Sequence, residues 1–269
     1  MKTNLAGLAP GMLGASLLFM LVFPLVGLLF ASGPSDIAEA LSHPLFGPAL
    51  WLSLKTSLLS LLILIITGIP LAWWLSQSTS SWSRFLETVT ELPVVLPPAV
   101  VGLGLLLTFG KGGMLAPFLD TFGITLPFTT AAVVTAQTVV AAPFFIQAAI
   151  GAFRQQAPDL QLVARTLGAT QQRYFWTIAL PMAMPGLLAG AILAWARALG
   201  EFGATLLFAG SRPSLTQTMP LAIYTALESD VNVALALALV LGGLSLILLL
   251  GVRSLSSRLQ MTLRRREVR

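Results

Sequence analysis

Two opposite charges lie four residues apart in the apolar segment 182–208, where ionisable side chains are rare. They are Arg197 and Glu201, and this spacing places both side chains on one face of a helix. Inside a membrane a lone charge would cost about 2.5–3.5 kcal/mol on insertion scales, and such groups usually face a bundle interior or a cavity. The pair therefore predicts either a gate or pathway element, or a neutral strut that holds helices together. Gly200 and Gly203 beside it permit close approach of another helix.

Polar side chains also run along the apolar segment 129–150. It carries several threonines and glutamines, among them Gln137, and many alanines. Such a segment is expected at the centre of a helical bundle rather than against lipid. Its hydroxyl and amide groups either line a path for a polar solute or form hydrogen bonds between helices.

No group of residues has the spacing of a catalytic or nucleotide-binding site. Glu87 and Glu91 lie one turn apart without a histidine or a third carboxylate, so we expect acids that stabilise a helix N-terminus. The single histidine, His43, is expected in an outer loop. Residues 110–113 lack the glycine spacing and the hydroxyl of a phosphate-binding loop, and the chain has no cysteine. We therefore expect no enzyme, no cofactor or metal, and no ATP hydrolysis by this chain itself.

The composition is that of a membrane protein. Apolar residues make up 56% of the 269 residues and charged residues 9%, against roughly 25% charged in a soluble domain. We therefore expect an all-α integral membrane protein. The net charge is +5, but six arginines crowd the C-terminus beside an apolar segment. Basic residues at that place fix topology and contact anionic membrane lipid, so nucleic acid is not an expected partner.

Six apolar segments come close to the ~20 residues that cross a bilayer core. They are residues 12–31, 51–75, 89–109, 129–150, 182–208 and 232–252. Prolines in the third, fourth and fifth predict kinked helices. With the N-terminus inside, eleven Lys and Arg lie on the inner side and three on the outer side. This bias predicts that both termini are cytoplasmic, and the first segment is too long for a cleaved signal.

A polar stretch between the fourth and fifth apolar segments predicts a short amphipathic helix on the cytoplasmic side. Pro158 and Asp159 open it, Leu160, Val163, Ala164 and Leu167 recur at helical spacing, and Gly168 closes it. Such a helix is either a surface for a soluble partner or an ordinary loop helix that lies on the lipid.

The same stretch resembles the cytoplasmic signature of permease subunits of bacterial ATP-binding-cassette importers. That pattern reads Glu-Ala-Ala, three residues, Gly, nine residues, Ile-x-Leu-Pro. Here Gly168 is followed after nine residues by Ile178-Ala179-Leu180-Pro181, while Leu162-Val163-Ala164 stands at the Glu-Ala-Ala positions without the acid. The runs 197–205, 92–98 and 217–224 are similar to the molybdate branch, which is close to the sulfate and tungstate permeases. The resemblance covers roughly residues 50 to 253.

The resemblance implies an importer of a tetrahedral oxyanion, with molybdate as the cargo of the most similar branch, in which this chain is the type I permease in a bacterial or archaeal plasma membrane. It implies two copies of the chain, two ATPase subunits and an external solute-binding protein. A stand-alone secondary transporter is the alternative class. The chain divides into an N-terminal helix and loop (1–49), a permease core (50–253) and a basic tail (254–269).

The resemblance also assigns candidate site residues. Those expected to couple to the ATPase are Asp159, Leu160, Val163, Ala164, Arg165, Leu167, Gly168 and Ala169. The candidates for the pathway or gate are Arg197, Glu201, Phe202, Thr205 and Gln137.

Overall fold

The computed structural model describes residues 5–31, 33–157 and 159–267, and every regular element in these ranges is a helix. Lys2, Pro158, and the side chains of the C-terminal arginines from Arg253 onward lie outside the described residues. The elements in chain order are α1 (Leu5–Ala31), α2 (Pro34–Ser42), α3 (Phe46–Gln77), α4 (Ser81–Val95), α5 (Pro98–Phe109), α6 (Ala116–Thr121), α7 (Thr130–Arg154), α8 (Asp159–Thr166), α9 (Gln171–Tyr174), the π-helix η1 (Phe175–Ala179), α10 (Leu180–Leu199), α11 (Gly203–Ala209), α12 (Met219–Ser229) and α13 (Val231–Glu267).

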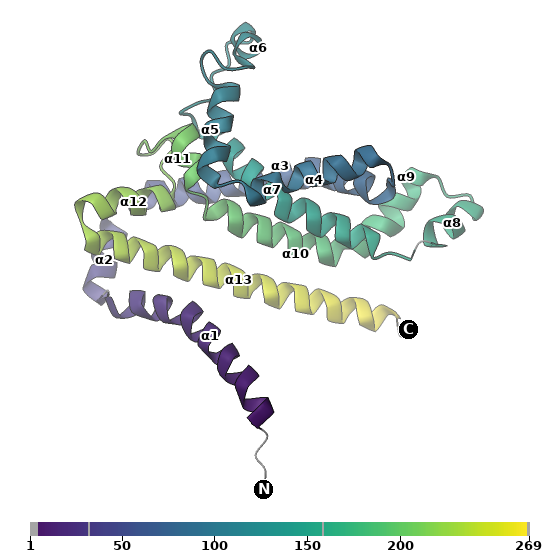
Figure 1. The fold of residues 1–269 in the computed structure, drawn as a ribbon, viewed down its shortest axis with the longest axis horizontal. Helices are drawn as coiled ribbons and strands as arrows, with labels where there is room; N and C mark the ends of the chain where they lie inside the picture. Colours follow the sequence, from purple (N-terminus) through teal and green to yellow (C-terminus); the bar gives the residue numbers. More distant parts are fainter. Residues whose placement is uncertain (1–4, 32, 158, 268–269) are drawn as a thin grey trace.

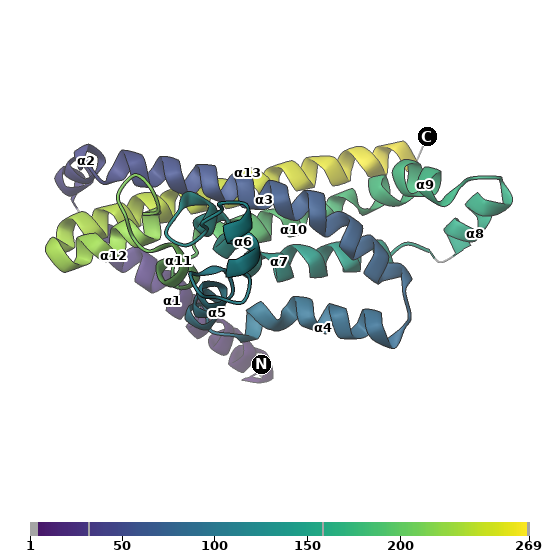
Figure 2. The same cartoon turned by 90° about the horizontal axis from the view of Figure 1, so that it is seen from above.

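The bundle is built around α7, which lies between α3 and α10 (Figures 1 and 2). Its buried residues include Phe145 and Ile150, which pack in one cluster with residues of α3 and α10. On α10, a Cβ added at Gly186 or Gly190 would lie 2.6 Å from the Cβ of an alanine of α7. These glycines let the two helix backbones approach closely, as small residues do in membrane bundles. The prediction that segment 129–150 is central is thereby confirmed.

Among the described residues, four helices are long and apolar enough to cross a membrane, or five if the bent pair α4–α5 is one span. The predicted spans 12–31 and 51–75 lie within α1 and α3, and 129–150 coincides with α7 from its N-cap residue Thr129 onward. The last predicted span, 232–252, lies within α13, whose described apolar part is the shorter run Val231–Ile247. The chain is therefore a multi-pass helical membrane protein, and the predicted count of about six spans holds approximately.

The predicted span over 89–109 is broken at its prolines, as the sequence indicated, but the break is a sharp bend between two helices rather than a kink within one. Helices α4 and α5 meet at an angle of 114°. Leu96, which precedes a proline, is extended (ψ 135°), and Pro98 is the first residue of α5. A residue before proline avoids the helical region, and proline suits the first position of a new helix. The two adjacent prolines therefore end one helix and begin another in a different direction.

The fifth predicted span, 182–208, is also interrupted. Helix α10 ends at Leu199, and the chain turns at Gly200 before α11 begins at Gly203. On its other side this span starts earlier than predicted, because α9, η1 and α10 continue into one another from Gln171. Within it, Leu180 donates to the Phe175 carbonyl in the π-helical register. The wider turn directly precedes Pro181, which has no N–H to donate.

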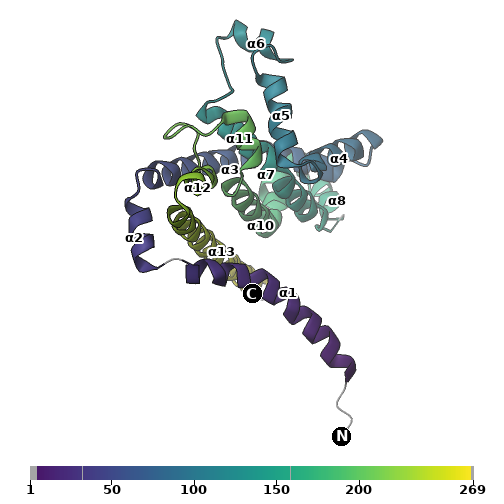
Figure 3. The same ribbon diagram turned by 60° about the vertical axis from the view of Figure 1, so that its left-hand side comes forward.

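Helices α5 and α11, which follow the breaks in the third and fifth spans, pack on each other. Figure 3 shows α5 and α6 standing away from the bundle, with α11 beside α5, while α1 extends on the opposite side. A Cβ added at Gly102 of α5 would lie 2.7 Å from the carbonyl oxygen of Ala204 in α11. At Gly203 it would lie 3.2 Å from the Cβ of Pro98. Glycine is therefore required at Gly102 for α5 and α11 to lie this close.

Candidate functional site

The predicted amphipathic helix is present as α8, and it ends as the sequence indicates. Gly168 has φ +83°, its N–H donates to the Arg165 carbonyl at 2.9 Å, and the Ala169 N–H donates to the Ala164 carbonyl at 2.9 Å. This pair of bonds is a Schellman motif, which satisfies the last carbonyls of a helix and places its C′ residue in the left-handed region. We call residues 157–173, which contain α8 and this stop, the finger.

The apolar residues of α8 divide between two surroundings. Ala164 is buried and Leu160 packs with it against Tyr174 and Ala179. Val163 and Leu167, which the spacing placed in the same stripe, are exposed, and Leu167 is 82% exposed. Leu162, at the position of the missing glutamate, is 64% exposed. The finger therefore presents an apolar surface, made of Leu162, Val163 and Leu167, that nothing in the described chain covers.

Charged residues flank this apolar surface. Asp159 lies in the first turn of α8 and Arg165 in its last turn, where each charge has a favourable interaction with the helix dipole. Arg165 and Arg173 are both exposed. The exposed side of the finger is therefore apolar with a mostly basic surround.

An aromatic cluster lies where the finger joins the bundle. The ring of Trp73 in α3 lies 5.1 Å from that of Phe153 in α7 and 5.2 Å from that of Phe175 in η1. The Tyr174 ring lies 6.1 Å from the same tryptophan. Centroid separations of this size are typical of favourable ring pairs. The cluster joins the ends of α3 and α7 to the start of the fifth span.

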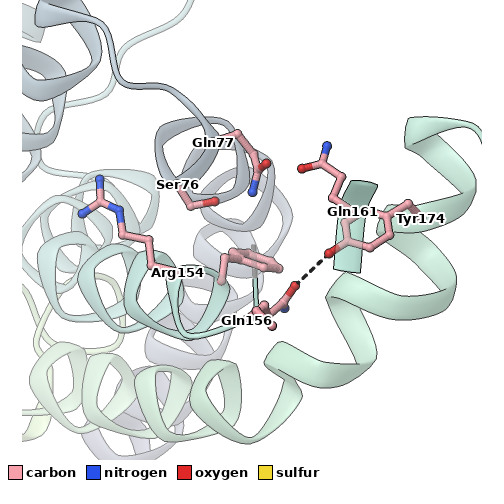
Figure 4. A pocket seen from close by; sticks show the side chains of 8 residues that line it. Ser76, Gln77, Arg154, Gln156, Gln161 and Tyr174 are labelled. Carbon is pink, nitrogen blue, oxygen red and sulfur yellow. Dashed lines mark hydrogen bonds between the residues drawn. The ribbon is translucent and has the colours of Figure 1, made fainter. Parts of the chain in front are cut away.

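A polar cavity of about 230 Å³ lies beside this cluster, between the finger and the bundle. Figure 4 shows side chains from α3, α7 and α8 around it. Its lining residues are Ser76, Gln77, Phe153, Arg154, Gln156, Ala157, Gln161 and Tyr174.

Gln156 lines this cavity, and its hydrogen-bond partners are two residues that follow the finger in the chain. Its Nε2 donates to the Ala179 carbonyl at 2.7 Å, and the Tyr174 hydroxyl donates to its Oε1 at 3.5 Å. The second contact, drawn in Figure 4, is at the long limit of a hydrogen bond. No local sequence pattern indicates Gln156, because its partners lie 18 and 23 residues further along the chain.

Arg154 joins α7 to α4 through a bidentate ion pair. Its two terminal nitrogens donate to the carboxylate oxygens of Glu87 at 2.8 and 2.7 Å. The prediction that Glu87 stabilises a helix N-terminus is therefore wrong, since α4 begins at Ser81, six residues earlier. An arginine and a carboxylate 67 residues apart give no local sequence signal.

The predicted pair in the fifth span is formed. Arg197 Nη1 lies 2.6 Å from Glu201 Oε2, and the other carboxylate oxygen accepts from the Ala204 N–H at 2.8 Å. Glu201 is only 1% exposed, whereas the Arg197 side chain is 26% exposed. Glu201 therefore has two functions in the structure, since it neutralises Arg197 and satisfies an N–H in the first turn of α11. This geometry is that of a strut at the turn between α10 and α11.

The other pathway candidates lie on two helices and in the turn before α11. Phe202 precedes α11, with its ring 5.3 Å from that of Tyr224. Gln137 and Thr205 are fully buried, and neither Gln137 Nε2 nor Thr205 Oγ1 has a hydrogen-bond partner among the described residues. Gln137 Oε1 accepts from Ser60 at 3.3 Å. The structure thus places Gln137 against α3 and Thr205 in α11.

A row of buried hydroxyls on α3 was missed in the sequence analysis. Ser53, Thr56, Ser57 and Ser60 are all fully buried. The Ser53 hydroxyl accepts from the Met219 N–H at 2.7 Å, and Ser57 accepts from the Trp195 indole at 3.0 Å. Their spacing of three and four residues was the available signal, since it places them on one helix face.

Comparisons with known proteins agree with the fold and the sequence motif. Residues 64–261 match the family model described as binding-protein-dependent transport system inner membrane component. The molybdenum transport system permease protein ModB of Mycobacterium tuberculosis (strain ATCC 25618 / H37Rv) is 44% identical over 204 residues, which cover 76% of this chain and 77% of the relative. The probable transport system permease protein NifC of Clostridium pasteurianum is 38% identical over 249 residues, which cover 91% and 87%.

Solved structures with the same fold are chains of bacterial ABC transporters. A transporter involved in the import of the acidic polysaccharide alginate has a TM-score of 0.75 at 19% identity, with 93% of this chain and 95% of that chain covered. The MetNI methionine ABC transporter in an inward-facing conformation has a TM-score of 0.63 at 18% identity, with 80% and 95% covered. At these identities the likeness shows the fold alone. The family match over residues 64–261 and the relatives at 38–44% identity establish that the chain belongs to the family of binding-protein-dependent transport system inner membrane components.

Proposed function

We propose that this chain is the permease subunit of an ATP-driven importer of a tetrahedral oxyanion, with molybdate as the cargo. The observation that carries the proposal is the finger. A short helix with exposed Leu162, Val163 and Leu167 ends in a Schellman motif and joins two spans in a chain without a phosphate-binding loop. Such a surface suits a groove on a separate ATPase, whose nucleotide-driven closure moves the finger.

Molybdate is proposed from the relatives. The proteins named molybdenum transport system permease ModB in Mycobacterium tuberculosis and Escherichia coli (strain K12) are 44% and 42% identical to this chain. Tungstate and sulfate are tetrahedral dianions of similar shape and are the competing cargoes. An external solute-binding protein delivers the anion and makes most of the choice among the three.

The assembly we propose contains two copies of this chain, two ATPase subunits and the binding protein. Two copies are needed because one chain supplies one finger for each ATPase and only half of a pathway. The proposed orientation follows the positive charges, with the finger and both termini in the cytoplasm. The C-terminal end of α13 lies at the same end of the bundle as α8 and α9 (Figure 1), which supports this orientation.

In the proposed cycle, ATP binding closes the ATPases and displaces the fingers, and the displacement tilts the spans until the pathway opens outward. The Arg197–Glu201 pair holds α11 to α10 during this movement. Hydrolysis and product release return the bundle to the inward-open state. Only contacts that differ between the two states can transmit this work.

The test is uptake by the purified complex in proteoliposomes, with the binding protein and molybdate, tungstate or sulfate outside and ATP inside. The proposal expects molybdate uptake that requires ATP and the ATPase. Uptake of any of the three anions without the ATPase would contradict an importer of this class. Preferred uptake of sulfate would still agree with an ATP-driven importer but would contradict molybdate as its cargo.

A further inference from the structure

The two ends of the finger meet at one side chain, Gln156. It is the second residue after α7 and the last before the finger, and its amide contacts two residues that come after the finger ends. The Nε2 donates to the carbonyl of Ala179 at 2.7 Å, and the Oε1 accepts from Tyr174 at 3.5 Å. A single amide therefore closes the base of a segment of seventeen residues, 157–173.

The carbonyl that Gln156 binds belongs to the last residue of the π-helix. Ala179 is fully buried, and Pro181 follows two residues later. A π-helical turn beside a proline is a place where the helix register is already altered, and such turns are frequent at functional sites. The Gln156 amide thus joins the end of α7 to the irregular start of the fifth span.

The cavity explains why this joint matters for movement. About 230 Å³ of space separates part of the finger, including Gln161, from the ends of α3 and α7. On the other side, Leu160 and Ala164 of α8 pack on Tyr174 and Ala179 at the start of the fifth span. A force on the exposed apolar surface of α8 therefore reaches the spans through these contacts and through the base of the finger. There Gln156 and the ring cluster of Trp73, Phe153, Tyr174 and Phe175 join the start of the fifth span to the ends of α3 and α7.

We propose that Gln156 is a positioning residue for energy transfer, which holds the start of the fifth span to the end of α7 when the ATPase displaces the finger. This inference rests on the proposed function. Without the amide, the finger remains attached through the backbone and the rings, and the ATPase still binds and hydrolyses ATP. The displacement then bends the base of the finger instead of tilting both spans, so fewer anions cross for each ATP consumed.

The experiment compares two variants in the purified complex in proteoliposomes. Gln156→Ala removes the amide, and Gln156→Glu keeps its size but replaces the donor by a carboxylate that repels the Ala179 carbonyl. We expect ATPase co-purification and ATP hydrolysis close to those of the wild type in both. We expect the anion taken up for each ATP hydrolysed to fall about threefold to tenfold, the factor that corresponds to one lost hydrogen bond. The fall should be larger for Gln156→Glu.

Gln155→Ala is the matched control, because Gln155 is the exposed neighbour of the same type, and its uptake for each ATP should stay at the wild-type value. Tyr174→Phe keeps the ring and removes only the long contact, so it should lower the ratio less than Gln156→Ala. An unchanged ratio in both Gln156 variants would overturn the proposal. Loss of ATPase binding, or an equal fall of hydrolysis and uptake, would also overturn it, since Gln156 would then be merely structural. A wild-type complex without ATP-driven uptake would instead reject the proposed function.

Discussion

At the scale of single residues, the central feature is a buried carboxylate with two partners. Glu201 is close to Arg197 and also accepts from the Ala204 N–H. The sequence spacing predicted the ion pair, because residues four apart share a helix face. The backbone partner was not predictable, because it exists only where α10 ends and the chain turns into α11.

We expect Glu201→Ala to lower the stability of the purified protein. The change leaves the Arg197 guanidinium without its carboxylate and an N–H of α11 without its acceptor. Removal of one partner of this kind costs about 1–3 kcal/mol, which should appear as a lower midpoint in thermal unfolding in detergent. The control is Glu201→Gln, which keeps an oxygen for the Ala204 N–H. Its unfolding midpoint should lie between those of the wild type and Glu201→Ala. An unchanged midpoint for Glu201→Ala would show that water or another group replaces the carboxylate.

At the scale of elements, the sequence predicted local helix signals well and long-range breaks poorly. Local features predicted α8 and its observed end, namely the periodicity of Leu160 and Ala164 and the stop at Gly168. They could do so because a helix cap depends only on residues close together in the chain. The bend between α4 and α5 was predicted only as a kink. Its size of 114° depends on how α5 packs against α11, and that contact joins residues about a hundred positions apart. The same limit applies to the Glu87–Arg154 pair and to Gln156.

Gly102→Ala should separate α5 from α11. The added Cβ would lie 2.7 Å from the carbonyl oxygen of Ala204 and 2.8 Å from its Cα, so one backbone must shift. Overpacking of this kind costs typically about 1–3 kcal/mol. Gly104→Ala, two residues along the same helix, meets nothing within 4 Å and is the control, which should be neutral or slightly stabilising. Thermal unfolding in detergent measures both, and equal midpoints would contradict the close packing.

Gly168→Val should uncouple ATP hydrolysis from uptake while membrane insertion remains normal. Gly168 has φ +83°, and a left-handed residue with a Cβ costs about 1–2 kcal/mol. The end of α8 would then change and carry the exposed Leu167 to a different position. Gly168→Asn, which tolerates this conformation, should retain most of the coupling. Normal uptake for each ATP in Gly168→Val would show that the stop of α8 has no role in transmission.

At the scale of the whole molecule, the structure joins a membrane bundle to a finger through a small set of contacts. The bundle core around α7 is closely packed. The finger, in contrast, is separated from the bundle by a cavity on one side and presents an exposed apolar surface. A rigid core and a separately attached finger are suited to receive a displacement at one end and to spread it over several spans. The proposed importer needs this arrangement, because its energy comes from another subunit.

The most direct measurement of this account is crosslinking from the finger to the ATPase. The chain has no cysteine, so Leu167→Cys carries a single thiol, which can be labelled with a maleimide photo-crosslinker in the native complex. The account predicts a covalent product with the ATPase subunit whose yield changes when ATP is bound. Met114→Cys, exposed in the loop before α6, should give no such product and should react with a membrane-impermeant maleimide from outside. The account is contradicted if Leu167→Cys never reaches the ATPase, or if it reacts from outside as Met114→Cys does.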